Sequence, residues 1–163
     1  METIIIDAYN LMHRVSELKI LMQQSQDVTV DTMVSKLHGH FYGKSAKVVI
    51  VFDGFGKNKH SGNIDVKFAS TGVGPDYGNA DELIKHLIEK SKNPKLIKII
   101  SSDRGITFFA RDFGCKIQTS DSFWGEIKDK RTFRREAYRE SKEKPDVVTK
   151  GEFEYMLKEF KKK

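Results

Sequence analysis

The sequence contains one cysteine, Cys115, and no uninterrupted apolar run long enough to cross a membrane. A single cysteine cannot form a disulfide within the chain, so the fold does not require an oxidising compartment. A membrane-spanning helix needs about 18 apolar residues, whereas the first apolar run stops at Asp7. That run is not preceded by the basic segment of a signal peptide. We therefore expect a cytoplasmic protein without a membrane partner.

The sequence also lacks several catalytic motifs. His38 and His40 are two residues apart on a helical pattern, and the histidines and the one cysteine do not have zinc-ligand spacing. Residues 72–75 are glycine-rich, but the Gly-Lys-Ser/Thr of a phosphate-binding loop does not follow them. No G-x-S-x-G segment supports an acyl hydrolase. Tyr9 and Asn10 do not supply the Asp-x-Asp motif of a haloacid dehalogenase phosphatase.

Positive charge is concentrated in one part of the chain. The 163 residues carry 29 Lys and Arg against 23 Asp and Glu, and residues 128–163 alone carry 13 against 8. A helix would place five of these basic residues on one face, namely Lys128, Arg131, Arg135, Arg139 and Lys142. Such a face suggests a polyanionic partner, nucleic acid before membrane, with a solvated helix as the alternative. We therefore divide the chain into a near-neutral body, residues 1–127, and a basic helical extension, residues 128–163.

Short runs rich in Ile and Val alternate with helical patterns in the body. Strands are predicted over residues 3–7, 47–52, 64–69, 96–101 and 115–119. A helix is predicted over about residues 80–91, because Asn79 and Glu82 form a capping pattern. Alternating strands and helices indicate an α/β fold with a mostly parallel, five-stranded central sheet.

Three of the predicted strands end in aspartate. These residues are Asp7, Asp53 and Asp103, and Asp81 lies in the first turn of the helix that follows the third strand. The carboxyl ends of parallel strands meet at one sheet edge, so the four carboxylates should converge there. A hard divalent cation such as Mg²⁺ relieves this crowding and suits phosphodiester hydrolysis. Any single one of these aspartates could instead be a helix cap.

The same acidic segments carry a family resemblance. Residues 4–11 resemble the D-G-Y-N opening of NYN domains, a branch of the PIN-like nucleases, and especially of their YacP-like members. Residues 51–54, 80–81 and 101–103 resemble that family's second-strand ending, acidic helix start and fourth-strand ending. The similarity covers residues 3–127 in order and spacing. Ala8 replaces the family's usual glycine, so the loop there could differ.

The resemblance implies a three-layer α/β/α PIN-like (NYN) domain with endoribonuclease activity that depends on Mg²⁺ or Mn²⁺. It implies that Asp7, Asp81 and Asp103 are metal ligands. It also implies that Asp53 is a ligand or a supporting acid and that Asn10 orients the site.

Candidate RNA-binding residues lie beside these acids. The segment 54–63 is predicted to be a flexible loop, in which Lys57 and Lys59 could hold phosphates and Phe55 could stack on an unpaired base. Arg14, expected near the start of the first helix, and Arg104 are candidate phosphate anchors. For each of these, a solvated or acid-paired side chain is the alternative.

We therefore expect an endoribonuclease that acts on single-stranded or loop RNA, with a ribosome or another ribonucleoprotein as a candidate partner. Two alternatives are a non-catalytic RNA-binding module on the same fold and a structure-specific DNA nuclease. Four clustered acids argue against a pure binder of a polyanion. The length of the chain leaves no room for the helical arch of flap-type DNA nucleases.

Overall fold

The computed structural model describes residues 1–128, and residues 129–163 lie outside the described part. The central sheet has the strand order β3-β4-β2-β1-β5-β6. Its strands are β1 (Glu2–Asp7), β2 (Ala46–Phe55), β3 (Lys59–Ser61), β4 (Ile64–Ser70), β5 (Ile97–Ile100) and β6 (Lys116–Gln118). All neighbouring strands pair in parallel except β3 and β4, which are antiparallel. The predicted mostly parallel sheet is therefore confirmed.

The strand count differs from the prediction by one. The five predicted runs all form strands, and the sixth strand, β3, lies inside the segment 54–63 that was expected to be a flexible loop. Strands β3 and β4 form a hairpin. The tight turn between them uses Gly62, which adopts a φ of 60°. Asn63 holds the end of the turn by donating hydrogen bonds to the carbonyl oxygens of Phe41 and Ala46.

The described part has seven helical segments around the sheet, of which the first six are labelled. These six are α1 (Ala8–Arg14), α2 (Ser16–Gln24), α3 (Gln26–Phe41), α4 (Ala80–Lys90), the short 3-10 helix η1 (Pro94–Leu96) and α5 (Arg104–Asp112). Residues 120–128 are also helical. The helix predicted over residues 80–91 is confirmed as α4, and the Asn79 side chain accepts a hydrogen bond from the Glu82 backbone N–H at its start. No described helix is long and apolar enough to cross a membrane.

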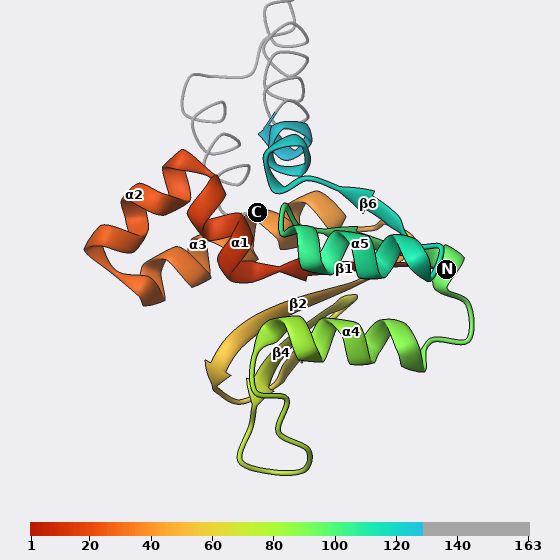
Figure 1. Cartoon of the computed structure of the whole chain (residues 1–163). Coiled ribbons are helices and arrows are strands. Elements are labelled where there is room, and N and C mark those ends of the chain that lie inside the picture. The colour runs from red at the N-terminus through yellow and green to blue at the C-terminus, as the bar shows by residue number, and fades with distance from the viewer. Residues whose placement is uncertain (129–163) are drawn as a thin grey trace, which may run out of the picture.

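The helices cover both faces of the sheet (Figure 1). On one face, Ile4 and Ile6 of β1 pack in a core with residues of α1, α2, α3 and the helix 120–128. On the other face, Ile5 packs in a second core with residues of α4 and α5. Because β1 is buried on both faces, its sequence is apolar at consecutive positions rather than at alternate ones. The protein thus has the predicted three-layer α/β/α arrangement.

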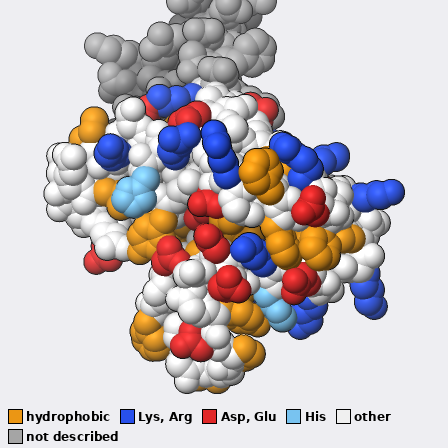
Figure 2. Space-filling view, viewed as in Figure 1, with side chains coloured by type: hydrophobic (Ala, Val, Ile, Leu, Met, Phe, Trp, Pro, Cys, Tyr) orange, Lys and Arg blue, Asp and Glu red, His pale blue; other side chains and the backbone are white. Residues whose placement is uncertain are grey.

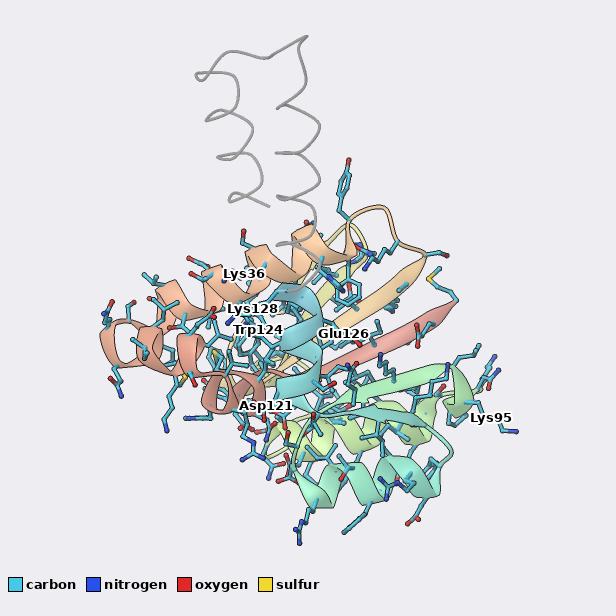
Figure 3. All side chains as sticks on the ribbon, turned by 90° about the horizontal axis from the view of Figure 1, so that it is seen from above. Lys36, Lys95, Asp121, Trp124, Glu126 and Lys128 are labelled. Carbon is cyan, nitrogen blue, oxygen red and sulfur yellow. The ribbon has the colours of Figure 1, made fainter. Side chains whose placement is uncertain are left out.

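The helix 120–128 is anchored to α2 and α3. Its Trp124 is only 3% exposed, and the Lys36 Nζ atom of α3 lies 5.4 Å from the centre of the Trp124 ring. Lys36 and Lys128 both form ion pairs with Glu17 of α2. Figure 3 shows Lys36, Trp124 and Lys128 close together on this side of the molecule. The helix therefore belongs to the layer formed by α1, α2 and α3.

A close approach at Gly56 predicts a large effect of a small substitution. An added Cβ atom there would lie 2.4 Å from Cδ1 of Phe68, whose ring is stacked on Phe52 at 5.3 Å between centroids. We expect Gly56→Ala to lower the free energy of unfolding by about 1–3 kcal/mol, because the Phe68 ring must move. Gly125→Ala is the matched control, since nothing lies within 4 Å of its added Cβ atom.

Gly125→Ala should leave the protein as stable or raise the free energy of unfolding by up to about 1 kcal/mol through helix propensity. Urea denaturation of the wild type and both variants measures the two effects. Equal stability of Gly56→Ala and the wild type would contradict the packing described for Phe68.

Candidate active site

Asp7 ends the central strand of the sheet and also begins the first helix. Its side chain is buried, with 6% of the residue exposed. One carboxylate oxygen accepts a hydrogen bond from the backbone N–H of Asn10 at 3.4 Å, so Asp7 is the N-cap of α1. The other oxygen accepts a hydrogen bond from the Ser101 hydroxyl at 3.3 Å. The strand β1 and these two bonds fix the carboxylate at the carboxyl edge of the sheet.

Asp53 and Asp81 come together where β2 ends and α4 begins. The Asp53 side chain is exposed and accepts a hydrogen bond from the backbone N–H of Ala80, the first residue of α4. This contact bridges 27 positions in the sequence and connects the end of β2 to the start of the helix. Asp81 is the next residue of α4 and is partly buried. The two carboxylates therefore lie at one corner of the sheet edge.

Asp103 occupies the corresponding position after β5. It is the N-cap of α5, and its side chain accepts a hydrogen bond from the backbone N–H of Ile106 at 3.0 Å. Its own backbone N–H donates to the Ser101 hydroxyl oxygen at 3.1 Å. Because that hydroxyl donates in turn to Asp7, Ser101 links the ends of β1 and β5 directly.

The pKa values indicate that the four acids act on one another. Burial raises the pKa of Asp7 from 3.8 to about 6; the Asn10 and Ser101 hydrogen bonds lower it, while the charges of Asp81 and Asp53 raise it. Burial also raises the pKa of Asp81, and the charges of Asp103 and Asp53 add to that rise. Each of the four carboxylates is therefore close enough to influence at least one other. The four acids thus lie at one sheet edge within range of a neighbouring acid's charge, and their role as a metal site stays a prediction.

The four acids differ in exposure: Asp7 is buried, Asp81 and Asp103 are partly exposed, and Asp53 is exposed. Among residues 1–128, none of the four acids forms a salt bridge, although the charge of Lys85 lowers the pKa of Asp81. No three carboxylate, histidine or cysteine side chains of these residues are gathered closely enough to form a complete metal-ligand group. In Figure 2, acidic side chains lie near the middle of the visible face. Within the described residues, the carboxylates at this edge therefore have no ion-pair partner.

Asn10 connects three parts of the site. Its side-chain oxygen accepts hydrogen bonds from the backbone N–H of Ser102 at 2.9 Å and from the hydroxyl of Ser120 at 2.7 Å. These contacts tie α1 to the β5–α5 connection and to the helix 120–128. The sequence-based interpretation named Asn10 but assigned no role to Ser101, Ser102 or Ser120. The position of Ser101 in the Ser-Ser-Asp segment could have indicated that it lies in the site. Nothing near Ser120 in the sequence indicates its hydrogen bond with Asn10.

The predicted RNA-binding residues of the described part all have exposed side chains. Phe55 is the last residue of β2 and is 76% exposed, and Lys57 and Lys59 are exposed beyond it. Arg104 is the exposed first residue of α5. Arg14 was expected near the start of the first helix, but it is the last residue of α1, because that helix is only seven residues long. The predicted residues Arg131, Arg135 and Arg139 lie outside the described part of the chain.

The described part of the chain also contains a pocket of about 210 Å³. It is lined by α4, β4 and the segment 71–77, and its wall includes Lys67, Tyr77 and His86. None of the four aspartates lines it. This pocket is therefore separate from the four carboxylates.

Comparisons with known proteins agree with this architecture. A family model described as a YacP-like NYN domain matches residues 4–162. Two crystal structures of Rae1 (YacP) from Bacillus subtilis are similar, each at 22% sequence identity. A mutant form gives a TM-score of 0.67 over 88% of this chain and 86% of that one, and a second structure gives 0.63 over 99% and 94%. The curated proteins gave no significant match.

The raised pKa of Asp7 predicts how stability depends on pH when divalent metal is absent. The pKa of the Asp7 carboxyl rises from 3.8 to about 6 on folding, so its protonated form stabilises the folded state. This stabilisation is fully present below about pH 4. That contribution, at most about 3 kcal/mol, is lost as the pH rises through 6. Asp7→Asn should therefore become progressively more stable than the wild type between pH 4 and pH 7.

Chemical denaturation in EDTA at several pH values measures this difference. Asp31→Asn, at an exposed position of α3, is the control and should stay within about 0.5 kcal/mol of the wild type at every pH. A difference between Asp7→Asn and the wild type that does not change with pH would contradict the shifted pKa.

Proposed function

Because the chain belongs to the YacP-like NYN domain family, we propose that it is an endoribonuclease that depends on Mg²⁺ or Mn²⁺. The family places it on the PIN-like nuclease fold, which the three-layer arrangement shares. The substrate we propose is single-stranded RNA or an RNA loop. A ribosome or another ribonucleoprotein is the proposed setting of that substrate.

One observation supports the proposal most strongly: four carboxylates are brought to one sheet edge at an energetic cost. Burial and mutual repulsion raise the pKa values of Asp7 and Asp81, so the folded protein is less stable than it would be with neutral side chains there. Bound RNA would add negative charge and increase the repulsion. A cation between the acids and the phosphates removes this conflict.

The donor chemistry of the edge fits a hard divalent cation. Asp7, Asp81 and Asp103 offer carboxylate oxygens, and Mg²⁺ is commonly held by one or two such groups together with water and substrate phosphates. An incomplete protein ligand group is therefore compatible with this metal. When bound there, such an ion would supply charge stabilisation at the scissile phosphate and activation of the attacking water.

The remaining residues would hold the acids and the RNA in position. Asp53, through the Ala80 N–H, keeps the start of α4 and hence Asp81 at the edge. Asn10 and Ser101 hold the segments that carry Asp7 and Asp103. Five exposed side chains are proposed to contact RNA, namely Arg14, Phe55, Lys57, Lys59 and Arg104. Arg131, Arg135 and Arg139 of the basic extension complete the proposed set.

A non-catalytic RNA-binding module is the second candidate function. The absence of a complete metal-ligand group among residues 1–128 favours it. The two candidates differ in what divalent metal does to the protein. Divalent metal should stabilise a nuclease and enable it to cleave RNA, whereas a binding module should show neither metal-dependent stabilisation nor cleavage.

Metal-dependent stability and cleavage test the proposal together. Mg²⁺ or Mn²⁺ should raise the melting temperature of the wild type, because an ion that binds only the folded state stabilises it. Asp103→Asn should lose most of that increase, and its rate of cleavage of a mixed single-stranded RNA pool should fall by orders of magnitude. Glu82→Gln is the matched control, because Glu82 is an exposed neighbour of Asp81 and should keep both properties within a few-fold.

EDTA should abolish cleavage by the wild type, and added Mn²⁺ should restore it. Wild-type protein that shows neither a metal-dependent melting shift nor EDTA-sensitive cleavage, yet binds RNA, would replace the nuclease with the binding module. Selective cleavage of branched DNA would support the third candidate function, a structure-specific DNA nuclease.

A further inference from the structure

Helix α5 carries an aromatic side chain on its solvent side. Its buried side is formed by Ile106 and Ala110, both fully buried, and Phe109 packs against the same core. Phe108 lies on the other side and is 56% exposed. Core packing therefore explains Phe109 but does not explain Phe108. A single exposed ring is common on a protein surface, so the side chains around Phe108 decide whether it marks a binding contact.

Two arginines flank the Phe108 ring on the same stripe of the helix. Arg104, Phe108 and Arg111 are separated by four and three positions, so they follow one another along one face. Both arginines are exposed, and the Arg111 guanidinium lies 5.9 Å from the centre of the Phe108 ring. At 1.5 Å per residue, the two arginines are attached about 10 Å apart along the axis. The stripe thus presents a ring between two cations.

The stripe begins at the acidic edge. Asp103 is the N-cap of α5, and Arg104 is the first residue of the helix, so the stripe leads away from the proposed cleavage site. Lys85 of α4 adds positive charge beside it, with its Nζ atom 5.5 Å from the Phe109 ring. Figure 2 shows hydrophobic side chains among Lys and Arg side chains on the part of the face where Figure 1 places α5.

We propose that the stripe Arg104, Phe108 and Arg111 binds the single-stranded RNA that flanks the cleavage site. The ring offers a stacking surface for one base, and the guanidinium groups offer paired donors for the phosphates on either side of it. This combination of cations and an exposed ring matches single-stranded nucleic acid better than an apolar protein surface. The inference deepens the proposed function and rests on RNA being the substrate.

Binding of a fluorescent single-stranded RNA oligonucleotide in EDTA tests the stripe without cleavage. Phe108→Ala should raise the dissociation constant roughly 5- to 150-fold, the range expected for one stacked base. Phe108→Tyr keeps the aromatic face and should bind within a few-fold of the wild type. Phe108→Leu keeps apolar area without that face, so it should bind as weakly as Phe108→Ala.

The charges give a second readout. Arg111→Gln should reduce the slope of log K against log salt by about 0.7, the value for one phosphate contact to a single strand. Asp112→Asn removes an exposed acid beside the stripe and should strengthen binding. Lys19→Gln, at an exposed position of α2 on the opposite face of the sheet, is the control and should change neither the affinity nor the slope.

Unchanged RNA affinity in Phe108→Ala and Arg111→Gln, with melting temperatures equal to that of the wild type, would overturn the proposal. Wild-type RNA affinity in Phe108→Leu would also overturn it, because base stacking on an aromatic face would then not contribute to binding. These outcomes are separate from the proposed function. If the wild type shows no metal-dependent cleavage but its RNA binding depends on Phe108, only the proposed nuclease activity is overturned.

Discussion

The central position of β1 is the constraint on which the acidic edge depends. This strand pairs with β2 on one side and with β5 on the other, and both pairings are parallel. The three strands therefore end at the same edge, and their last residues lead into Asp7, the Asp53 region and Asp103. Burial on both faces leaves the edge as the place where polar side chains can leave the sheet.

The same arrangement makes the site costly for the folded protein. Asp7 is buried next to other carboxylates, and hydrogen bonds from Asn10 and Ser101 offset only part of the rise in its pKa. The Ser101 hydroxyl connects two of the acidic segments, because it donates a hydrogen bond to the Asp7 carboxylate and accepts one from the backbone N–H of Asp103. Stability is thus given up at the position where the proposed chemistry needs negative charge, as is common at functional sites.

Local patterns predicted the sheet and the acids well. Runs of Ile and Val marked the strands, and an aspartate after a run marked the edge, because both signals lie in a few consecutive residues. The hairpin at β3 was missed, since three exposed residues have no apolar pattern and depend on the Gly62 turn. Ser120 was missed because it meets Asn10 across 110 positions. The end of α1 at Arg14 was also missed, and there the chain leaves the helix at Val15, whose backbone is extended.

Direct titration of the Asp7 carboxyl by NMR in metal-free protein is the most direct test that the four acids share one electrostatic environment. The structure predicts a pKa of about 6 in the wild type and a lower pKa in Asp81→Asn, because the charge of Asp81 is one cause of the rise. A wild-type pKa near 3.8 that does not change in Asp81→Asn would contradict the convergence of the carboxylates and, with it, the proposed metal site.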